Sequence, residues 1–271
     1  MLPFSLIVAV LSCFPSRALA SHGLSSRALL TFASPLDGGG SMLNNAGGGL
    51  GEPLNVIISG LSSPNVLTNG GILNYARSLG FSNECFNVHL GDPQSANLGD
   101  GNGPVNQTIE LRQDFGDAAF GTCFESLIGG NHFRVYRQNG PKANTGALFL
   151  AVSHEEDVSQ HHTISLPDGY DNGRDLLVAA ATAGDTFFDG ALYNAVAQNV
   201  TGLLPVGAVG INHNIPIDGV AVLLTVTIAN AFDPCANGVS WCSSAPHTMM
   251  PQLSTIAFSV MLCMFMAFSL L

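Results

Sequence analysis

The chain has 271 residues, and its net charge of -11 at pH 7 argues against partners that carry a phosphate backbone. An acidic surface repels polyanions, so we expect no nucleic-acid partner. Hydrophobic residues make up 46% of the chain and charged residues only 10%, but part of this apolar excess lies in the two terminal segments and does not describe a core.

The first twenty residues have the pattern of a cleavable signal peptide. The apolar run 2–14 is too short to span a bilayer, and Ala18-Leu19-Ala20 follows it with the small residues that signal peptidase recognises. We therefore predict residues 1–20 as a signal peptide and a secreted product; the alternative is a buried N-terminal helix.

The last nineteen residues form an uncharged tail, 253–271. A retained membrane helix is normally followed by Lys or Arg, yet the last basic residue is Arg174. The triplet Ser243-Ser244-Ala245 and a short polar spacer precede the tail, which is the order of a GPI-anchor signal. We expect attachment at Ser243, with Ser244 or Asn237 as alternatives, and a retained transmembrane helix as the competing interpretation. Either one predicts an extracellular protein attached to the cell surface or plasma membrane.

Four cysteines remain when both terminal segments are set aside: Cys85, Cys123, Cys235 and Cys242. An oxidising compartment favours two disulfides, and the most local pairing is Cys85 with Cys123 and Cys235 with Cys242. A zinc site is the alternative, although no C-x-x-C pair is present.

Two N-glycosylation sequons begin at Asn106 and Asn199, and a secreted chain should carry both on its surface.

Glycine and asparagine dominate residues 37–51, which cannot bury enough apolar surface to offset the entropy of ordering. We accordingly expect 21–51 to be a flexible linker and 52–233 to be the folded domain. A cysteine-containing stalk and anchor spacer, 234–252, and the hydrophobic tail, 253–271, complete the organisation.

The folded domain opens with a predicted strand, 54–59, and a helix. Apolar positions recur at helical spacing, with Asn69 ahead of them and Gly80 after them. These positions are Ile72, Tyr75, Ala76 and Leu79.

Residues 132–136 alternate, which places His132, Arg134 and Tyr136 on one face of a strand. The apolar run 147–153 follows after a turn-rich loop, so the two strands should form a hairpin.

A helix is predicted at 172–183 with Asp171 as its N-cap, and a strand at 220–229. Because strands and helices mix without regular βαβ alternation, the predicted fold class is α+β: a mixed, mainly antiparallel sheet with two or more helices in a single domain.

The loop 91–105 contains four oxygen-bearing side chains that could serve calcium. They are Asp92, Asn97, Asp100 and Asn102. The spacing of an EF-hand is absent, and the same residue types are what turns require, so turn chemistry is favoured.

Titratable groups are densest between His154 and Asp175. His154 with His161 or His162 and a carboxylate forms a candidate metal site. The H-E-x-x-H motif is absent, and a solvated acidic loop is the alternative.

Several motifs follow one another in this part of the chain: HFRVYRQ, GALFLAVS, Asp157, His161-His162, Pro167-Asp168 and RDLLV. Together they resemble the LssY C-terminal domain family in a stand-alone, secreted, fungal-type version. The resemblance spans about residues 54–181, and its specific part is 131–178. It implies a shared polar motif but no reaction. The motif residues would be His132, Arg134, Asp157, His161, His162, Asp168, Arg174 and Asp175.

Two functions are compatible with these patterns. The first is a glycosylated cell-surface protein with a binding or structural role. The second is a surface hydrolase with a His/Arg/Asp site that either depends on a metal or acts on an anionic substrate. Candidate catalytic residues are His132, Arg134, Asp157 and His161, and candidate binding residues are Arg137, Asp168, Arg174 and Asp175.

Arg134 and Arg137 would suit an anionic group; alternatively, Arg134 pairs with an acidic neighbour. The sequence does not identify a cofactor. Convergence of the histidines and Arg134 in one pocket would favour the hydrolase.

Overall fold

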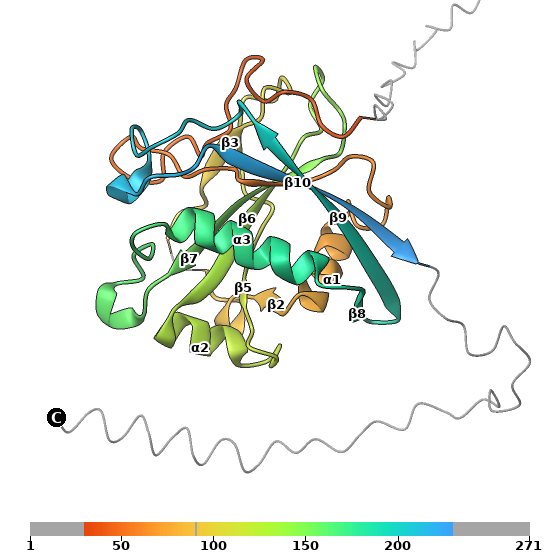
Figure 1. Cartoon of the computed structure of the whole chain (residues 1–271), viewed down its shortest axis with the longest axis vertical. Coiled ribbons are helices and arrows are strands. Elements are labelled where there is room, and N and C mark those ends of the chain that lie inside the picture. Colours follow the sequence, from red (N-terminus) through yellow and green to blue (C-terminus); the bar gives the residue numbers. More distant parts are fainter. Residues whose placement is uncertain (1–29, 90, 230–271) are drawn as a thin grey trace, which may run out of the picture. The chain divides into compact units, whose positions relative to one another are not determined.

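Three apolar runs of the predicted folded domain lie side by side at the centre of an eight-stranded sheet (Figure 1). They are β7 (Leu148–Glu155), β1 (Val56–Ile58) and β10 (Val220–Ala229). The computed structural model describes residues 30–89 and 91–229. Within this part the sheet order is β2-β5-β6-β7-β1-β10-β9-β8.

The outer strands are β2 (Phe81–Asn83), β5 (Ile109–Gln113), β6 (Gly130–Arg137), β9 (Ala191–Thr201) and β8 (Thr186–Phe188). β3 (Ser95–Asn97) and β4 (Pro104–Asn106) form a separate two-stranded sheet. The helices are α1 (Asn69–Ser78), α2 (Gly121–Ile128) and α3 (Gly169–Thr182), and the short 3₁₀ turns are η1 (Cys85–Asn87), η2 (Val158–Gln160) and η3 (Asn212–Asn214).

Only β1 and β10 pair in parallel, while every other strand pair described in the large sheet is antiparallel. β6 and β7 form the predicted hairpin. The predicted fold class, a single α+β domain with a mixed and mainly antiparallel sheet, is confirmed.

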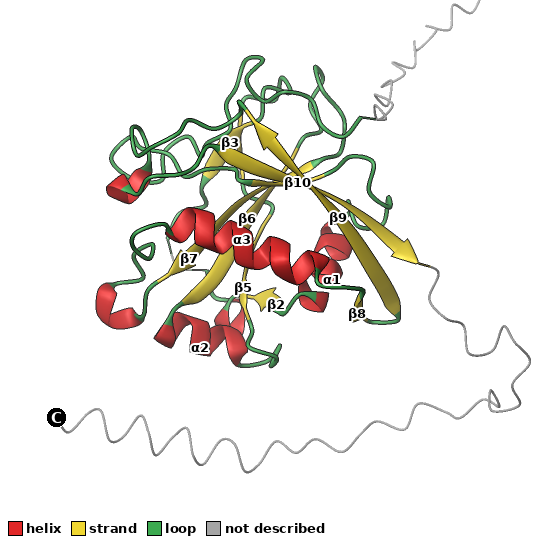
Figure 2. Ribbon diagram, viewed as in Figure 1, coloured by secondary structure: helices red, strands yellow, loops and turns green. Residues whose placement is uncertain are grey.

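The two faces of the sheet are covered differently. On one face, apolar side chains of the strands pack against the buried sides of α1 and α3, and Figure 2 shows α3 crossing the strands. On the other face, Tyr136, Phe149 and Leu223 pack against Leu43 and β3. Polar side chains replace this second apolar layer further along β5, β6 and β7, and they form the site described below.

The structure corrects the predicted linker. Residues 30–51 belong to the folded unit, since Leu43 is buried and forms a bridge with Ala96. Glycine permits close backbone approach here: a Cβ on Gly39 would lie 2.2 Å from the carbonyl oxygen of Asn97. The glycines that suggested flexibility therefore serve tight packing.

α1 agrees with its prediction, and α3 begins earlier than predicted. Thr68 caps α1 by accepting the backbone N–H of Gly71 at 2.9 Å. The predicted N-cap of α3 was wrong, because Asp168 occupies that position and Asp171 lies in the first turn. There the carboxylate of Asp171 accepts the backbone N–H of Asp218 at 2.8 Å.

A disulfide joins Cys85 in η1 to Cys123 in α2, as the local pairing predicted. No helix among the described residues is long and apolar enough to cross a membrane. The predicted signal peptide, the pairing of Cys235 with Cys242, the anchor site at Ser243 and the hydrophobic tail lie outside the described residues.

Candidate functional site: a buried charge cluster

Strand pairing brings charged side chains from β5 and β6 together on the face opposite α1 and α3. Arg112 pairs with His132, and Glu110 pairs with Arg134, so all four side chains project from the same face. Glu155 joins them from the end of β7, and Glu125 from α2. We call the whole group the charge cluster; its members are Glu52, Glu84, His89, Glu110, Arg112, Glu125, His132, Arg134, Glu155 and His162.

Arg112 lies at the centre of the cluster. Its Nη1 lies 3.0 Å from Oε2 of Glu125 and 3.0 Å from Oε2 of Glu155, and its Nη2 lies 2.9 Å from Oε1 of Glu110. These carboxylates are almost completely shielded from solvent. Burial alone would lower the pKa of Arg112, but the neighbouring carboxylates raise it, so the guanidinium stays charged.

Arg134 is held by a second set of carboxylates. Its Nε lies 3.0 Å from Oε2 of Glu110, and its Nη1 lies 3.5 Å from Oε2 of Glu52. The alternative that Arg134 pairs with acidic neighbours is therefore confirmed.

Negative charge exceeds positive charge in the cluster. Five glutamates face two arginines, which leaves a formal excess of three negative charges when all five glutamates are ionised and the histidines are neutral. Burial raises the pKa of Glu125 to about 7 and also raises the pKa values of Glu52 and Glu84. Such shifts indicate a site that lacks enough compensating positive charge.

His132 is completely buried within this group. Its Nε2 lies 3.2 Å from Nη1 of Arg134 and 3.4 Å from Oγ of Ser153, whereas its Nδ1 faces Oε1 of Glu155 at 3.5 Å without a hydrogen bond. Burial first, and then the positive charge of Arg134, lowers the pKa of His132 well below its ordinary value, so the ring is neutral.

His162 approaches the same carboxylate from the loop after η2. Its Nδ1 is 3.7 Å from Oε2 of Glu155 and, like that of His132, is buried without a hydrogen-bond partner. Two imidazoles thus flank Glu155.

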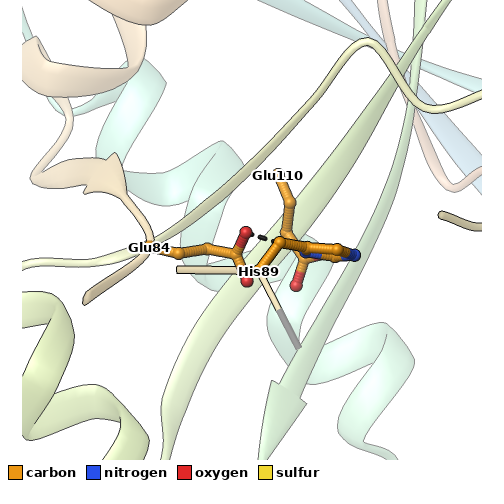
Figure 3. A group of neighbouring side chains, drawn as sticks. All are labelled: Glu84, His89 and Glu110. Atoms are coloured by element: carbon orange, nitrogen blue, oxygen red, sulfur yellow. Dashed lines mark hydrogen bonds and ion pairs between the residues drawn. The ribbon is translucent and has the colours of Figure 1, made fainter. Parts of the chain in front are cut away.

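Two groups of side chains within the cluster have the composition and spacing of metal ligands. One consists of Glu125, His132 and Glu155, all buried. The other consists of Glu84, His89 and Glu110, which Figure 3 shows with their side chains pointing toward one another. In this second group Nδ1 of His89 forms a direct contact of 2.8 Å with Glu84, and Glu110 is already bonded to both arginines.

A cavity of about 450 Å³ opens beside the cluster. Charged and apolar side chains share its wall: Glu84, Phe86, Val88, Arg112, Ser126 and His162. The disulfide between Cys85 and Cys123 ties together two segments around it, η1 and α2.

Of the candidate catalytic and metal residues, the structure brings together His132, Arg134 and His162. His154 does not join them, since it alternates with Glu155 along β7 and its Nδ1 lies 3.1 Å from Oγ of Ser165. His161 is exposed. Asp157 caps η2 by accepting the backbone N–H of Ser159 at 2.7 Å, and hydrogen bonding from the side chain and then the backbone of Ser159 lowers the pKa of Asp157. The predicted metal set of His154, His161 and His162 is therefore not assembled.

The predicted anion pair of arginines is also not assembled, because Arg137 lies three residues after Arg134 and projects from the opposite face. Arg137 donates to Oδ1 of Asn69 at 2.8 Å.

The remaining binding candidates have structural positions around α3. Arg174 is buried and binds Asp218 through both terminal nitrogens, at 2.7 and 2.9 Å, as well as Asp175 at 2.8 Å and the carbonyl of Val220 at 2.8 Å. Asp168 is exposed at the N-cap of α3 and makes no side-chain capping bond.

Sequence reasoning missed most acidic members of the cluster. Glu110 and Arg112 lie in the segment IELRQ, in which apolar and charged residues alternate as they do in the neighbouring strand 132–136. This alternation was the available signal for a second strand with charged side chains on one face. Glu52, Glu84 and Glu125 come from loops and from α2, and no local pattern distinguishes them from surface residues.

Two further expectations concern the surface. Asn106 and Asn199 are exposed, as glycan acceptors require. In the loop 91–105, the buried carboxylate of Asp100 accepts backbone N–H groups of Asn102, Asn139 and Gly140 at 2.8–3.0 Å, which supports turn chemistry.

Comparisons with known proteins identify no relative: no family model matches the chain, and no curated protein or solved structure matches it either. The resemblance to the LssY C-terminal domain family stays a prediction.

Proposed function

We propose that the protein is a secreted, surface-attached protein whose domain binds a ligand and does not hydrolyse one. The observation that carries this proposal is the mutual pairing of the candidate catalytic groups. His132 has no exposed surface, and Arg134 is bonded to Glu110 and lies near Glu52. A general base or an anion-binding arginine must reach its substrate, and neither side chain is placed to do so.

The cavity beside the cluster is the proposed ligand site. Its volume of about 450 Å³ lies within the range typical of small-molecule sites, and Phe86 and Val88 supply apolar wall while Glu84 and Arg112 supply polar groups. Ser126 on α2 also lines it, so Ser126→Phe should fill the cavity from a helix position that is only partly buried.

A thermal-shift screen of small molecules against the wild-type protein and Ser126→Phe tests this site. Ligands of the cavity should raise the melting temperature of the wild-type protein and leave that of Ser126→Phe unchanged, because a bound ligand stabilises only the state that binds it. Leu127→Phe, at an exposed neighbouring position, is the matched control and should respond like the wild-type protein. Equal shifts in Ser126→Phe would place the ligand elsewhere.

Catalysis is tested separately with chromogenic ester and phosphate substrates. We expect no turnover. Turnover that disappears in His162→Ala would instead support the surface hydrolase.

We further propose attachment through a GPI anchor and membership of the LssY C-terminal domain family. The support is the Ser243-Ser244-Ala245 triplet ahead of an uncharged tail, and the motifs between residues 131 and 178. Phosphatidylinositol-specific phospholipase should release the protein from membranes, whereas a retained transmembrane helix would keep it there.

A further inference from the structure

Glu155 lies between two histidine nitrogens that have no hydrogen bond. Nδ1 of His132 is 3.5 Å from Oε1 of Glu155, and Nδ1 of His162 is 3.7 Å from Oε2. Both nitrogens are buried and unpartnered within the part of the chain that the structure describes. Hydrogen bonds between nitrogen and oxygen span about 2.7–3.2 Å, so these groups are too far apart to bond directly.

The spacing instead matches that of atoms sharing a metal ion. In a tetrahedral zinc site the metal lies about 2.0–2.2 Å from nitrogen and oxygen ligands, which puts neighbouring ligand atoms about 3.4 Å apart. The ligand atoms of Glu125, His132 and Glu155 all lie within 4.8 Å of one another. A contraction would bring these three to bonding distance. His162 lies outside this group and faces the other oxygen of Glu155 at 3.7 Å, so its loop would have to turn toward the same point for it to become the fourth ligand.

Charge and orientation favour a cation at this point. With all five glutamates ionised the cluster would have three excess negative charges, two of which a divalent ion would neutralise. Arg112 donates to Oε2 of Glu125 and to Oε2 of Glu155 at 3.0 Å each, and to Oε1 of Glu125 at 3.2 Å, and so fixes the orientation of both carboxylates. Such outer contacts are how proteins orient metal ligands.

We propose that Glu125, His132, Glu155 and His162 bind one divalent transition-metal ion of the zinc class. Two imidazoles and two carboxylates suit zinc, whereas calcium and magnesium prefer oxygen ligands alone. Four protein ligands make a closed site, whose role is structural. The ion would join α2, β6, β7 and the loop after η2. This proposal goes beyond the proposed ligand-binding function and does not depend on it.

Ligation through Nδ1 fixes the tautomer of His132. The ring proton then lies on Nε2, which faces Oγ of Ser153 at 3.4 Å. Arg134, whose Nη1 lies 3.2 Å from Nε2, keeps its contacts with Glu110 and Glu52.

The test uses zinc itself and the full-length protein after treatment with a chelator. Calorimetric titration with Zn²⁺ should show one site, and Co²⁺ in its place should give the visible absorption of a four-coordinate ion. His162→Ala should weaken binding about tenfold or more. His162 is one-third exposed, so its removal should leave the fold intact, as circular dichroism would verify. His161→Ala, at the adjacent exposed position, is the matched control and should bind like the wild-type protein.

Glu125→Gln provides a second variant from a different element and should also weaken binding. Absence of zinc binding in the wild-type protein would overturn the proposal. Equal losses in His161→Ala and His162→Ala would do the same. Loss of binding in His89→Ala, with His162→Ala unaffected, would place the ion in the group of Glu84, His89 and Glu110 and would also overturn it.

Discussion

The two most heavily paired arginines, Arg112 and Arg174, differ in what their loss leaves behind. Arg112→Met strips the guanidinium from Glu110, Glu125 and Glu155, whose side chains are 1%, 0% and 9% exposed. Breaking a buried ion pair from one side costs about 3–5 kcal/mol, because the remaining charge is uncompensated. We therefore expect Arg112→Met to lower the free energy of unfolding by about 3–5 kcal/mol at neutral pH.

Arg174→Met is the matched control. It also removes a guanidinium with several carboxylate partners, but Asp218 and Asp175 are 45% and 66% exposed, so water solvates them when the arginine is gone. Solvent-exposed ion pairs contribute little, and the cost should be about 1–2 kcal/mol, mainly from lost hydrogen bonds such as that to the carbonyl of Val220.

Urea denaturation of both variants in the presence of a chelator would measure these differences, and their pH dependence adds a second criterion. Burial raises the pKa of Glu125 to about 7, so its folded-state pKa lies above the unfolded value. The contribution of Glu125 to the stability of the folded protein is therefore present at acidic pH and is lost as the pH rises toward 7. The penalty of Arg112→Met should consequently shrink between about pH 7 and pH 5, as carboxyl groups take up protons. Equal penalties for the two variants at neutral pH, or a pH-independent penalty for Arg112→Met, would refute this account.

Three further predictions concern the framework around the cluster. Gly173→Ala should destabilise the protein by about 1–3 kcal/mol in urea denaturation, because a Cβ there would lie 2.6 Å from the carbonyl carbon of Ser153 and push α3 off β7; an unchanged midpoint would contradict this close approach. Replacing Cys85 and Cys123 by serine opens a loop with a sequence separation of 38 residues, which loop entropy alone values at about 4 kcal/mol, and calorimetry would test whether the melting temperature falls accordingly. Burial tends to raise the pKa of Asp218, but hydrogen bonds from Arg174 and the backbone of Val220 lower it overall. Asp218→Asn should therefore lower the free energy of unfolding by on the order of 1 kcal/mol at neutral pH, and by progressively less as acid protonates the wild-type carboxylate. A constant difference in unfolding free energy down to about pH 3 would count against this prediction.

The strands at the centre of the sheet were predictable because their signal is local. The runs 54–59, 147–153 and 220–229 are apolar over most of their length, and each forms a central strand. The alternation of residues 132–136 placed His132 and Arg134 on one face correctly. Their partners were not predictable in the same way, because Glu52, Glu84 and Glu125 reach the cluster through loop paths and a helix position that only the tertiary fold defines.

The predictions of a flexible linker and of a histidine metal site were wrong for a related reason. Glycine content indicated flexibility in residues 37–51, whereas the structure uses Gly39 where two backbone segments approach too closely for a side chain. Sequence proximity grouped His154 with His161 and His162, but strand alternation sends His154 to the other face. The composition of a short segment thus identified which residues are polar, but not the direction in which their side chains point.

α2 shows why the cluster matters for more than local charge balance. Its buried positions are Gly121, Thr122 and Glu125, whereas Phe124, Leu127 and Ile128 are exposed, so the helix turns polar groups inward and apolar groups outward. The hydrophobic effect therefore contributes little to holding it against the sheet. Its attachment depends on the disulfide from Cys123 to Cys85, on the ion pair of Glu125 with Arg112, and on the proposed metal through Glu125. These three links act on one helix beside one cavity, so weakening any of them should loosen the cavity wall before it unfolds the sheet.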